Sequence, residues 1–173
     1  MNTVHTTPVV LIADDNVDRR LSLRQALEAE NLTVTEAADV KACLKSCRND
    51  TPELLVLSSA LPGADDLWHT LKTEPQYQHL NSLVILTTTD VPTLTQFCEA
   101  DDCVLESLPI PLIARRACAL VQQHALEQVV DFQRTILSQM ADAVVAVDND
   151  SRVMYWNPEA ERVYGIPASE IKR

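Results

Sequence analysis

The stretch Val9-Val10-Leu11-Ile12-Ala13-Asp14-Asp15 decides the fold of this 173-residue chain. A run of consecutive apolar residues is typical of a strand that is buried on both faces, as in a parallel sheet. Two acidic residues follow directly, so the strand places Asp14 and Asp15 at its C-terminal end. Carboxylates at the end of a buried strand are a candidate functional site.

Similar strands follow along the chain. Residues 54–57 and 83–86 are continuous apolar runs, 103–105 is a shorter run, and residues 32–35 alternate apolar and polar side chains. Amphipathic stretches with helical spacing separate these segments. Strands that alternate with helices predict right-handed crossovers and a parallel sheet covered on both faces. We therefore expect an α/β fold built on a doubly wound, five-stranded parallel sheet.

The composition limits the classes of partner. The chain has 14 Lys and Arg against 25 Asp and Glu, which gives a net charge of −11 and a pI near 4.6. Nucleic acid and anionic membranes bind surfaces with an excess of basic residues, so we expect neither as a partner. No run approaches the roughly 20 apolar residues of a spanning helix, and the N-terminus lacks a signal-peptide pattern. We expect a cytoplasmic protein with its 5 cysteines reduced.

Polar residues end the predicted strands. Asp14 and Asp15 follow the first strand, Ser58 ends the third, Thr87 follows the fourth and Glu106 follows the fifth. In open parallel sheets ligands bind outside the carboxyl ends of the strands. These side chains therefore form the candidate site.

The strand-end residues resemble those of the receiver domain of response regulators. The likeness also includes the loop Leu61-Pro62-Gly63-Ala64-Asp65 and the pair Asp101-Asp102. It covers residues 8–125 and implies a flavodoxin-like fold.

The resemblance implies a role for each position. In receivers the acidic pair, here Asp14 and Asp15, helps to hold Mg²⁺, which makes Mg²⁺ a candidate cofactor. Thr87 matches the residue that binds the phosphoryl group. An Asp four residues before the loop proline accepts that group, but Ser58 stands there. Glu106 replaces the Lys that neutralises the phosphate, and Cys103 replaces the switch aromatic.

These departures remove phosphotransfer chemistry. A serine hydroxyl cannot form the labile acyl phosphate that a carboxylate forms. At about 4 Å and an effective dielectric near 20, one unit-charge interaction is roughly 4 kcal/mol, so an anion at Glu106 opposes phosphate binding. We expect a pocket of Asp14, Asp15 and Glu106 without a matching cation, in which a carboxyl is protonated or a divalent cation is bound. The sequence predicts an unphosphorylated pseudo-receiver without catalytic residues.

Two alternatives stay open. Asp65 or Asp66, in the loop after the third strand, could replace the missing acceptor and keep a phosphate-accepting receiver. Cys103 could act as a redox switch, although burial in a strand favours an inert thiol.

A long helix is predicted from about Pro111 to Met140. Its first part carries apolar residues suited to packing on the sheet. Residues 126–140 carry a second apolar stripe that the domain has no surface left to cover (Leu126, Val129, Val130, Ile136, Leu137, Met140). We predict a linker helix that pairs with a second copy as a short coiled coil, with packing onto the next domain as the alternative.

Residues 141–173 resemble the start of a PAS sensor domain. Apolar residues 143–147 and 153–156 predict a hairpin. Trp156-Asn157-Pro158-Glu159 opens a helix with Asn157 as its N-cap. A hairpin and one helix cannot bury an apolar face, so we expect a truncated PAS domain in a piece of a longer protein.

The order of receiver, linker and PAS implies a regulatory module of a multidomain two-component signalling protein that is not itself an enzyme. By resemblance, the full-length protein would be a sensor histidine kinase or a cyclic-di-GMP enzyme. We expect a homodimer formed by the linker and by the face of the fourth helix, fifth strand and fifth helix. Other signalling proteins are the remaining expected partners.

Overall fold

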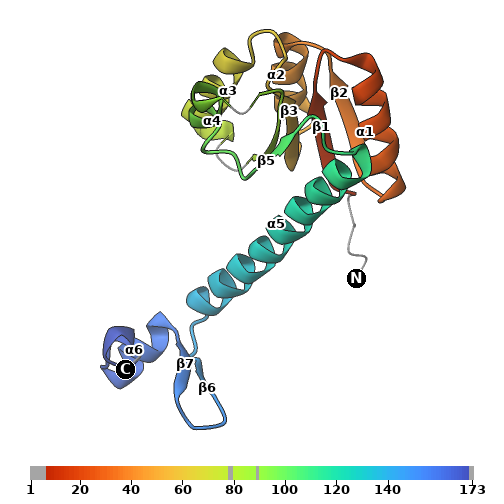
Figure 1. Ribbon diagram of the computed structural model, residues 1–173. Helices are drawn as coiled ribbons and strands as arrows, with labels where there is room; N and C mark the ends of the chain where they lie inside the picture. The colour runs from red at the N-terminus through yellow and green to blue at the C-terminus, as the bar shows by residue number, and fades with distance from the viewer. Residues whose placement is uncertain (1–6, 78–79, 89, 172–173) are drawn as a thin grey trace. The chain divides into compact units, whose positions relative to one another are not determined.

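The computed structural model describes residues 7–77, 80–88 and 90–171 (Figure 1). Its contacts divide the chain into two compact units, Met1–His124 and Ala125–Arg173. The first unit holds the predicted sheet and the second holds the predicted hairpin. Among the helices of the described residues, none is both long and apolar enough to cross a membrane.

A parallel sheet forms the centre of the first unit. Its strands are β1 (Val9–Ala13), β2 (Thr33–Ala37), β3 (Leu54–Ser58), β4 (Asn81–Leu86) and β5 (Asp102–Leu105). They lie in the order β2-β1-β3-β4-β5, and every neighbouring pair is parallel. The continuous apolar runs occupy the three central positions, where both faces of a strand are buried. The predicted five-stranded, doubly wound fold is confirmed.

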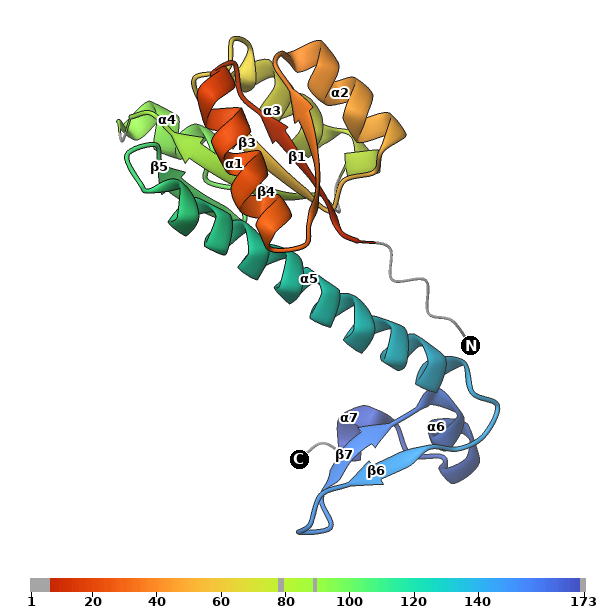
Figure 2. The same cartoon turned by 90° about the vertical axis from the view of Figure 1, so that its right-hand side faces the viewer.

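Helices cover both faces of this sheet (Figure 2). α1 (Val17–Ala29) and the first part of α5 (Ile110–Gln139) pack on one face. α2 (Val40–Asn49) and α3 (Ala64–Thr73) pack on the other, followed by a short 3-10 helix at Pro75–Tyr77. α4 (Val91–Gln96) is a brief helix, and Phe97 directly after it joins the core of α2 and α3.

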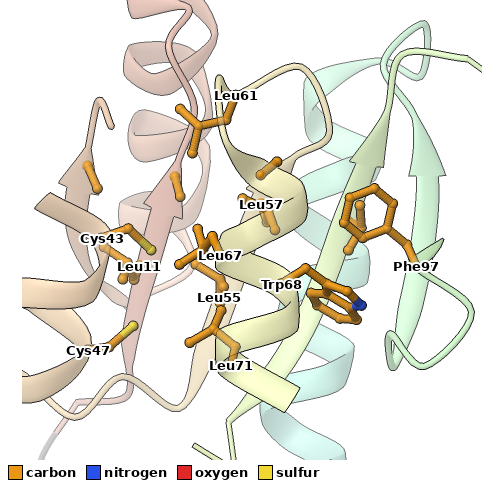
Figure 3. Close-up of a cluster of buried hydrophobic side chains, with 14 of the residues drawn as sticks. Leu11, Cys43, Cys47, Leu55, Leu57, Leu61, Leu67, Trp68, Leu71 and Phe97 are labelled. Atoms are coloured by element: carbon orange, nitrogen blue, oxygen red, sulfur yellow. The ribbon is translucent and has the colours of Figure 1, made fainter. Parts of the chain in front are cut away.

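The core beneath α2 and α3 is closely packed (Figure 3). Trp68 of α3 and Phe97 meet edge to face, with ring centroids 5.4 Å apart. Cys43 and Cys47 of α2 are buried in the same core, to which Leu11 also belongs. Both cysteines therefore pack as small apolar side chains.

Burial differs between the two parts of α5. In the first part, Ile113, Ala114, Ala117 and Val121 are buried. Beyond His124, Leu137 of the predicted stripe is half-buried, whereas the other large apolar side chains are exposed in the second unit (Leu126, Val129, Val130, Phe132, Ile136, Met140). The helix reaches Gln139, close to the predicted end.

The second unit contains a hairpin and two short helices. β6 (Val145–Val147) and β7 (Val153–Trp156) pair in antiparallel fashion, and α6 (Pro158–Tyr164) and α7 (Ala168–Ile171) follow. The predicted strand at 143–147 begins only at Val145. The reason is that the backbone of Val144 bonds to Asn157 instead. The N–H of Val144 donates to Asn157 Oδ1, and the backbone N–H of Asn157 donates to the carbonyl of Val144.

Asn157 is fully buried and connects the parts of the second unit. Its Oδ1 accepts the N–H of Val144 and of Ala160, each at 2.9 Å. Its Nδ2 donates to the carbonyls of Leu137 at 3.1 Å and Asp142 at 2.9 Å. The predicted N-cap is confirmed, and the same amide also ties the end of α5 to the hairpin.

Candidate functional site

Four strands deliver polar residues to one edge of the sheet. Asp14 follows β1, Ser58 ends β3, Thr87 follows β4 and Glu106 follows β5. Asp14 and Ser58 are fully buried, whereas Asp15, Thr87 and Glu106 are exposed. The predicted residues share one edge of the sheet but differ sharply in their contact with solvent.

Arg19 of α1 connects three of these residues. Its Nε donates to Asp14 Oδ2, and its Nη2 donates to Asp14 Oδ1 at 3.0 Å. The same Nη2 donates to Ser58 Oγ at 3.0 Å, while Nη1 donates to Glu106 Oε2 at 3.0 Å. One guanidinium thus spans the ends of β1, β3 and β5.

The start of α1 positions this arginine. Asn16 is the N-cap of α1, and its side chain accepts the N–H of Arg19 at 3.0 Å. The N–H of Asn16 in turn donates to Asp14 Oδ1 at 2.9 Å. Arg20 donates to the backbone carbonyl of Asp14 at 2.6 Å and pairs with Glu36. The turn after β1 is therefore held by two consecutive arginines.

A cation of the chain itself partly neutralises the charges of the site. The Asp14 side chain is 1% exposed, that of Arg19 is 13% exposed and that of Glu106 is 46% exposed. Hydrogen bonding to Asp14, and then to Glu106, raises the pKa of Arg19 above its already high ordinary value despite the opposing effect of burial. The expected pocket without a matching cation is therefore wrong, because Arg19 supplies the cation.

Arg19 was missed because its position in α1 carries no motif. A signal existed nevertheless: it lies three residues after the N-cap Asn16, within the first turn of α1. Carboxylates at the ends of two predicted strands, Asp14 and Glu106, also favour a nearby cation. Sequence alone leaves Arg19, Arg20 and Arg24 of α1 equally eligible for that role.

The two hydroxyl residues have different partners. Ser58 Oγ accepts from Arg19 and, at 3.3 Å, from the N–H of Ala60. The hydroxyls of Thr87 and Ser59 are 3.2 Å apart, and the N–H of Thr87 donates to Ser59 Oγ at 3.0 Å. Ser59, which the sequence analysis did not single out, therefore positions the predicted phosphate-binding residue.

Cys103 differs from its predicted environment. It lies in β5 but is exposed rather than buried, because β5 is the edge strand of the sheet. Its Sγ lies 3.8 Å from the carbonyl oxygen of Phe97. Partial desolvation, followed by the charges of Asp102 and Cys98, raises the pKa of its thiol. Access to Cys103 is thus open, whereas thiolate formation is disfavoured.

Asp65 and Asp66 lie in the first turn of α3 and are exposed. Asp65 borders a surface hollow together with Trp68, His69 and Thr95, on the side of α3 that faces α4. In the described residues, the contacts of the Arg19 guanidinium are to Asp14, Ser58 and Glu106 instead.

The donor set does not fit a magnesium ion. Both oxygens of Asp14 already bind Arg19, and Ser58 offers no carboxylate, so of the predicted pair only the exposed Asp15 could still offer one. Mg²⁺ prefers carboxylate and water oxygens in octahedral geometry. Within residues 7–77, 80–88 and 90–171, no group of three or more His, Cys, Asp or Glu side chains could hold a metal ion.

The family model of the response regulator receiver domain matches residues 10–104, and the chain belongs to this family. The model of the PAS fold matches residues 131–173. The chain is therefore a receiver domain of two-component signalling followed by a PAS region, as its motifs predict. A search of curated proteins found no match to this sequence.

Solved receiver structures share the fold. The CheY-like receiver domain protein of Methanospirillum hungatei JF-1 is 17% identical, with a TM-score of 0.64 over 70% of this chain and 99% of that one. The receiver domain of a signal transduction histidine kinase from Syntrophus aciditrophicus is 16% identical, with a TM-score of 0.62 over 68% and 92%. NtrX from Brucella abortus is 20% identical, with a TM-score of 0.67 over 83% and 32%.

Proposed function

We propose that this chain is a pseudo-receiver: a regulatory module that signals without aspartyl phosphorylation. It pairs with a second copy and passes the resulting change in packing through α5 to the PAS region. The observation that carries this proposal is the occupation of the phosphorylation pocket by Arg19, which binds both Asp14 and the buried Ser58.

The contacts of Ser58 argue against phosphoryl transfer. Its side chain is fully buried, and its hydroxyl oxygen accepts hydrogen bonds from Arg19 and Ala60. A phosphate donor would have to displace Arg19, which would leave the buried Asp14 without its cation. Glu106 lies on the same guanidinium and would repel an incoming phosphate.

The face formed by α4, β5 and α5 supports pairing between two copies. It exposes four large apolar side chains: Val91 and Leu94 of α4, Leu105 of β5 and Leu112 of α5. Clusters of exposed apolar residues mark protein interaction sites. Across the same face, Arg116 pairs with Asp102 at 2.7 Å, so polar contacts accompany the apolar ones.

The linker supports transmission to the PAS region. The apolar side chains exposed on the second part of α5 suit pairing with an identical helix, because such a stripe is covered when two helices pack together. Asn157 then joins the end of that helix to the hairpin through Leu137 and Asp142. A shift of the end of α5 would therefore be transmitted to the hairpin through these hydrogen bonds.

An adduct experiment tests the proposal. The full chain is mixed with beryllofluoride and Mg²⁺ for fluorine NMR, and with acetyl phosphate for intact-mass measurement. We expect no stoichiometric adduct, while a phosphorylatable receiver treated in parallel reacts. A rapid, reversible adduct on the wild-type chain would sink the proposal.

The alternative acceptors are separated by matched variants. If an adduct forms, its loss in Asp65→Asn or Asp66→Asn identifies a phosphate-accepting receiver with a displaced acceptor. A redox switch predicts instead a peroxide-dependent change of oligomeric state that Cys103→Ser abolishes. The exposure of Cys103 makes this second test worthwhile.

The larger protein is part of the same proposal. A receiver followed by a PAS region fits the input end of a cytoplasmic sensor histidine kinase or of a cyclic-di-GMP enzyme. Reading the gene beyond the codon of Arg173 tests this directly. A dimerisation or nucleotide-binding catalytic domain there supports the proposal, and a DNA-binding domain contradicts it.

A further inference from the structure

We infer that Arg19 permanently takes the place of the metal ion in this receiver, so that the pocket is independent of magnesium. This role deepens the proposed function and rests on it. Receiver domains commonly bind Mg²⁺ at the phosphorylation site. Here the Arg19 side chain contacts Asp14, one of the two carboxylates predicted to hold such an ion, and Ser58 at the predicted acceptor position.

The first step is the occupation of both carboxylate oxygens of Asp14. Its Oδ1 accepts from the N–H of Asn16 and from Arg19 Nη2, and its Oδ2 accepts from Arg19 Nε. A divalent cation could bind Asp14 only after the guanidinium had left. Because like charges repel strongly in a pocket of low dielectric, Arg19 and a metal ion exclude each other there.

The second step is the choice of neighbours. Ser58 replaces a carboxylate by a hydroxyl, which is a good acceptor for a guanidinium N–H but a weak ligand for a hard cation. Glu106 supplies a carboxylate on the opposite side, where Nη1 of Arg19 reaches it. The substitutions at positions 58 and 106 therefore both suit an arginine.

The third step is what the guanidinium ties together. One planar side chain links the ends of β1, β3 and β5, and a fork of this kind holds its partners in fixed directions. The occupancy of a metal ion would depend on its concentration, whereas Arg19 is part of the chain and is always present. The pocket therefore remains in one arrangement at any magnesium concentration.

Manganese binding to the full chain tests this role. Mn²⁺ broadens the NMR signals of nearby amides, so amides around Asp14 and Thr87 report on the pocket without any measure of activity. In the wild-type chain we expect these signals to broaden no more than those beside exposed surface carboxylates. In Arg19→Met we expect selective broadening there, together with an unfolding temperature that rises with MgCl₂.

Arg24→Met is the matched control. Arg24 lies on the same helix but pairs with Glu28 and Glu36 on the surface. Its loss should leave the manganese response of the pocket unchanged. The double variant Asp14→Asn/Arg19→Met should lose the magnesium response again, because the carboxylate that would bind the ion is gone.

Each outcome decides the question. Selective broadening in the wild-type chain overturns the inference, even if Arg19→Met does not fold. A folded Arg19→Met that gains no metal response overturns it as well. A wild-type chain that binds Mn²⁺ but forms no beryllofluoride adduct removes this inference alone, whereas an adduct removes the proposed function.

Discussion

The pocket at the strand ends and the second part of α5 differ in how far their side chains find partners within the chain. In the pocket, a buried carboxylate, a buried hydroxyl and an exposed carboxylate all meet one arginine of the same chain. Along the second part of α5, most apolar side chains from Leu126 to Ile136 remain exposed within their unit. The pocket has completed its contacts internally, and the linker has not. Regulation through the surface of this receiver is therefore easier to explain than regulation through its pocket.

The largest expected effect comes from removing the arginine of the pocket at the strand ends. Arg19→Met leaves the charge of Asp14 buried and unpaired, which should lower the free energy of unfolding by about 3–5 kcal/mol. Denaturant unfolding of the full chain measures this loss. Asp14→Asn should cost less, because Arg19 keeps Glu106 as a partner and is itself partly exposed. Equal losses of unfolding free energy in the two variants would show that the unpaired buried charge of Asp14 is not the cause.

The next effect comes from placing charged side chains on the second part of α5. Val129→Glu together with Ile136→Glu should weaken pairing of the linker at least a hundredfold, which corresponds to about 2.7 kcal/mol. The reason is that a paired helix would have to bury both carboxylates. Light scattering over a concentration series measures the change in mass. Gln133→Glu on the same helix is the control, and a monomeric wild-type chain at all concentrations would contradict the prediction.

A smaller, local effect is expected at the junction to the PAS region. Asn157→Ala removes four hydrogen bonds, three of them partly buried and one buried, a cost of about 2 kcal/mol to this unit. Hydrogen exchange should rise over residues 143–147 and in α6 while that of the sheet stays the same. Asn149→Ala, in the exposed hairpin turn, is the control. Unchanged exchange would mean that the amide does not hold the junction.

The smallest effect concerns Cys103. Its raised pKa leaves less thiolate at neutral pH than an ordinary cysteine has, so alkylation should be slow. The rate should increase with pH and level off only above the ordinary thiol pKa, near 8.5. Iodoacetamide labelling with peptide mass spectrometry follows the reaction, and Cys103→Ser gives the background. Fast labelling at neutral pH would restore the redox alternative.

The helix caps show how far local patterns carry. Asn16, Asp39 and Asn157 each accept a backbone N–H three residues later, as their short side chains before helical stretches indicate. Cys103 shows the limit. A strand pattern predicts its backbone conformation, but its exposure depends on β5 being at the edge of the sheet, which only the strand order decides.

The amino-acid sequence alone determined the alternating strands and helices, the family, and the presence of Ser58 and Glu106 at the ends of two strands. These features are local, because they follow from periodicity and from residue identity at fixed spacings. The tertiary structure alone decided which cation binds these two residues. Arg19 meets Ser58 and Glu106 across 39 and 87 residues of chain, and such a meeting depends on how α1 packs over the sheet.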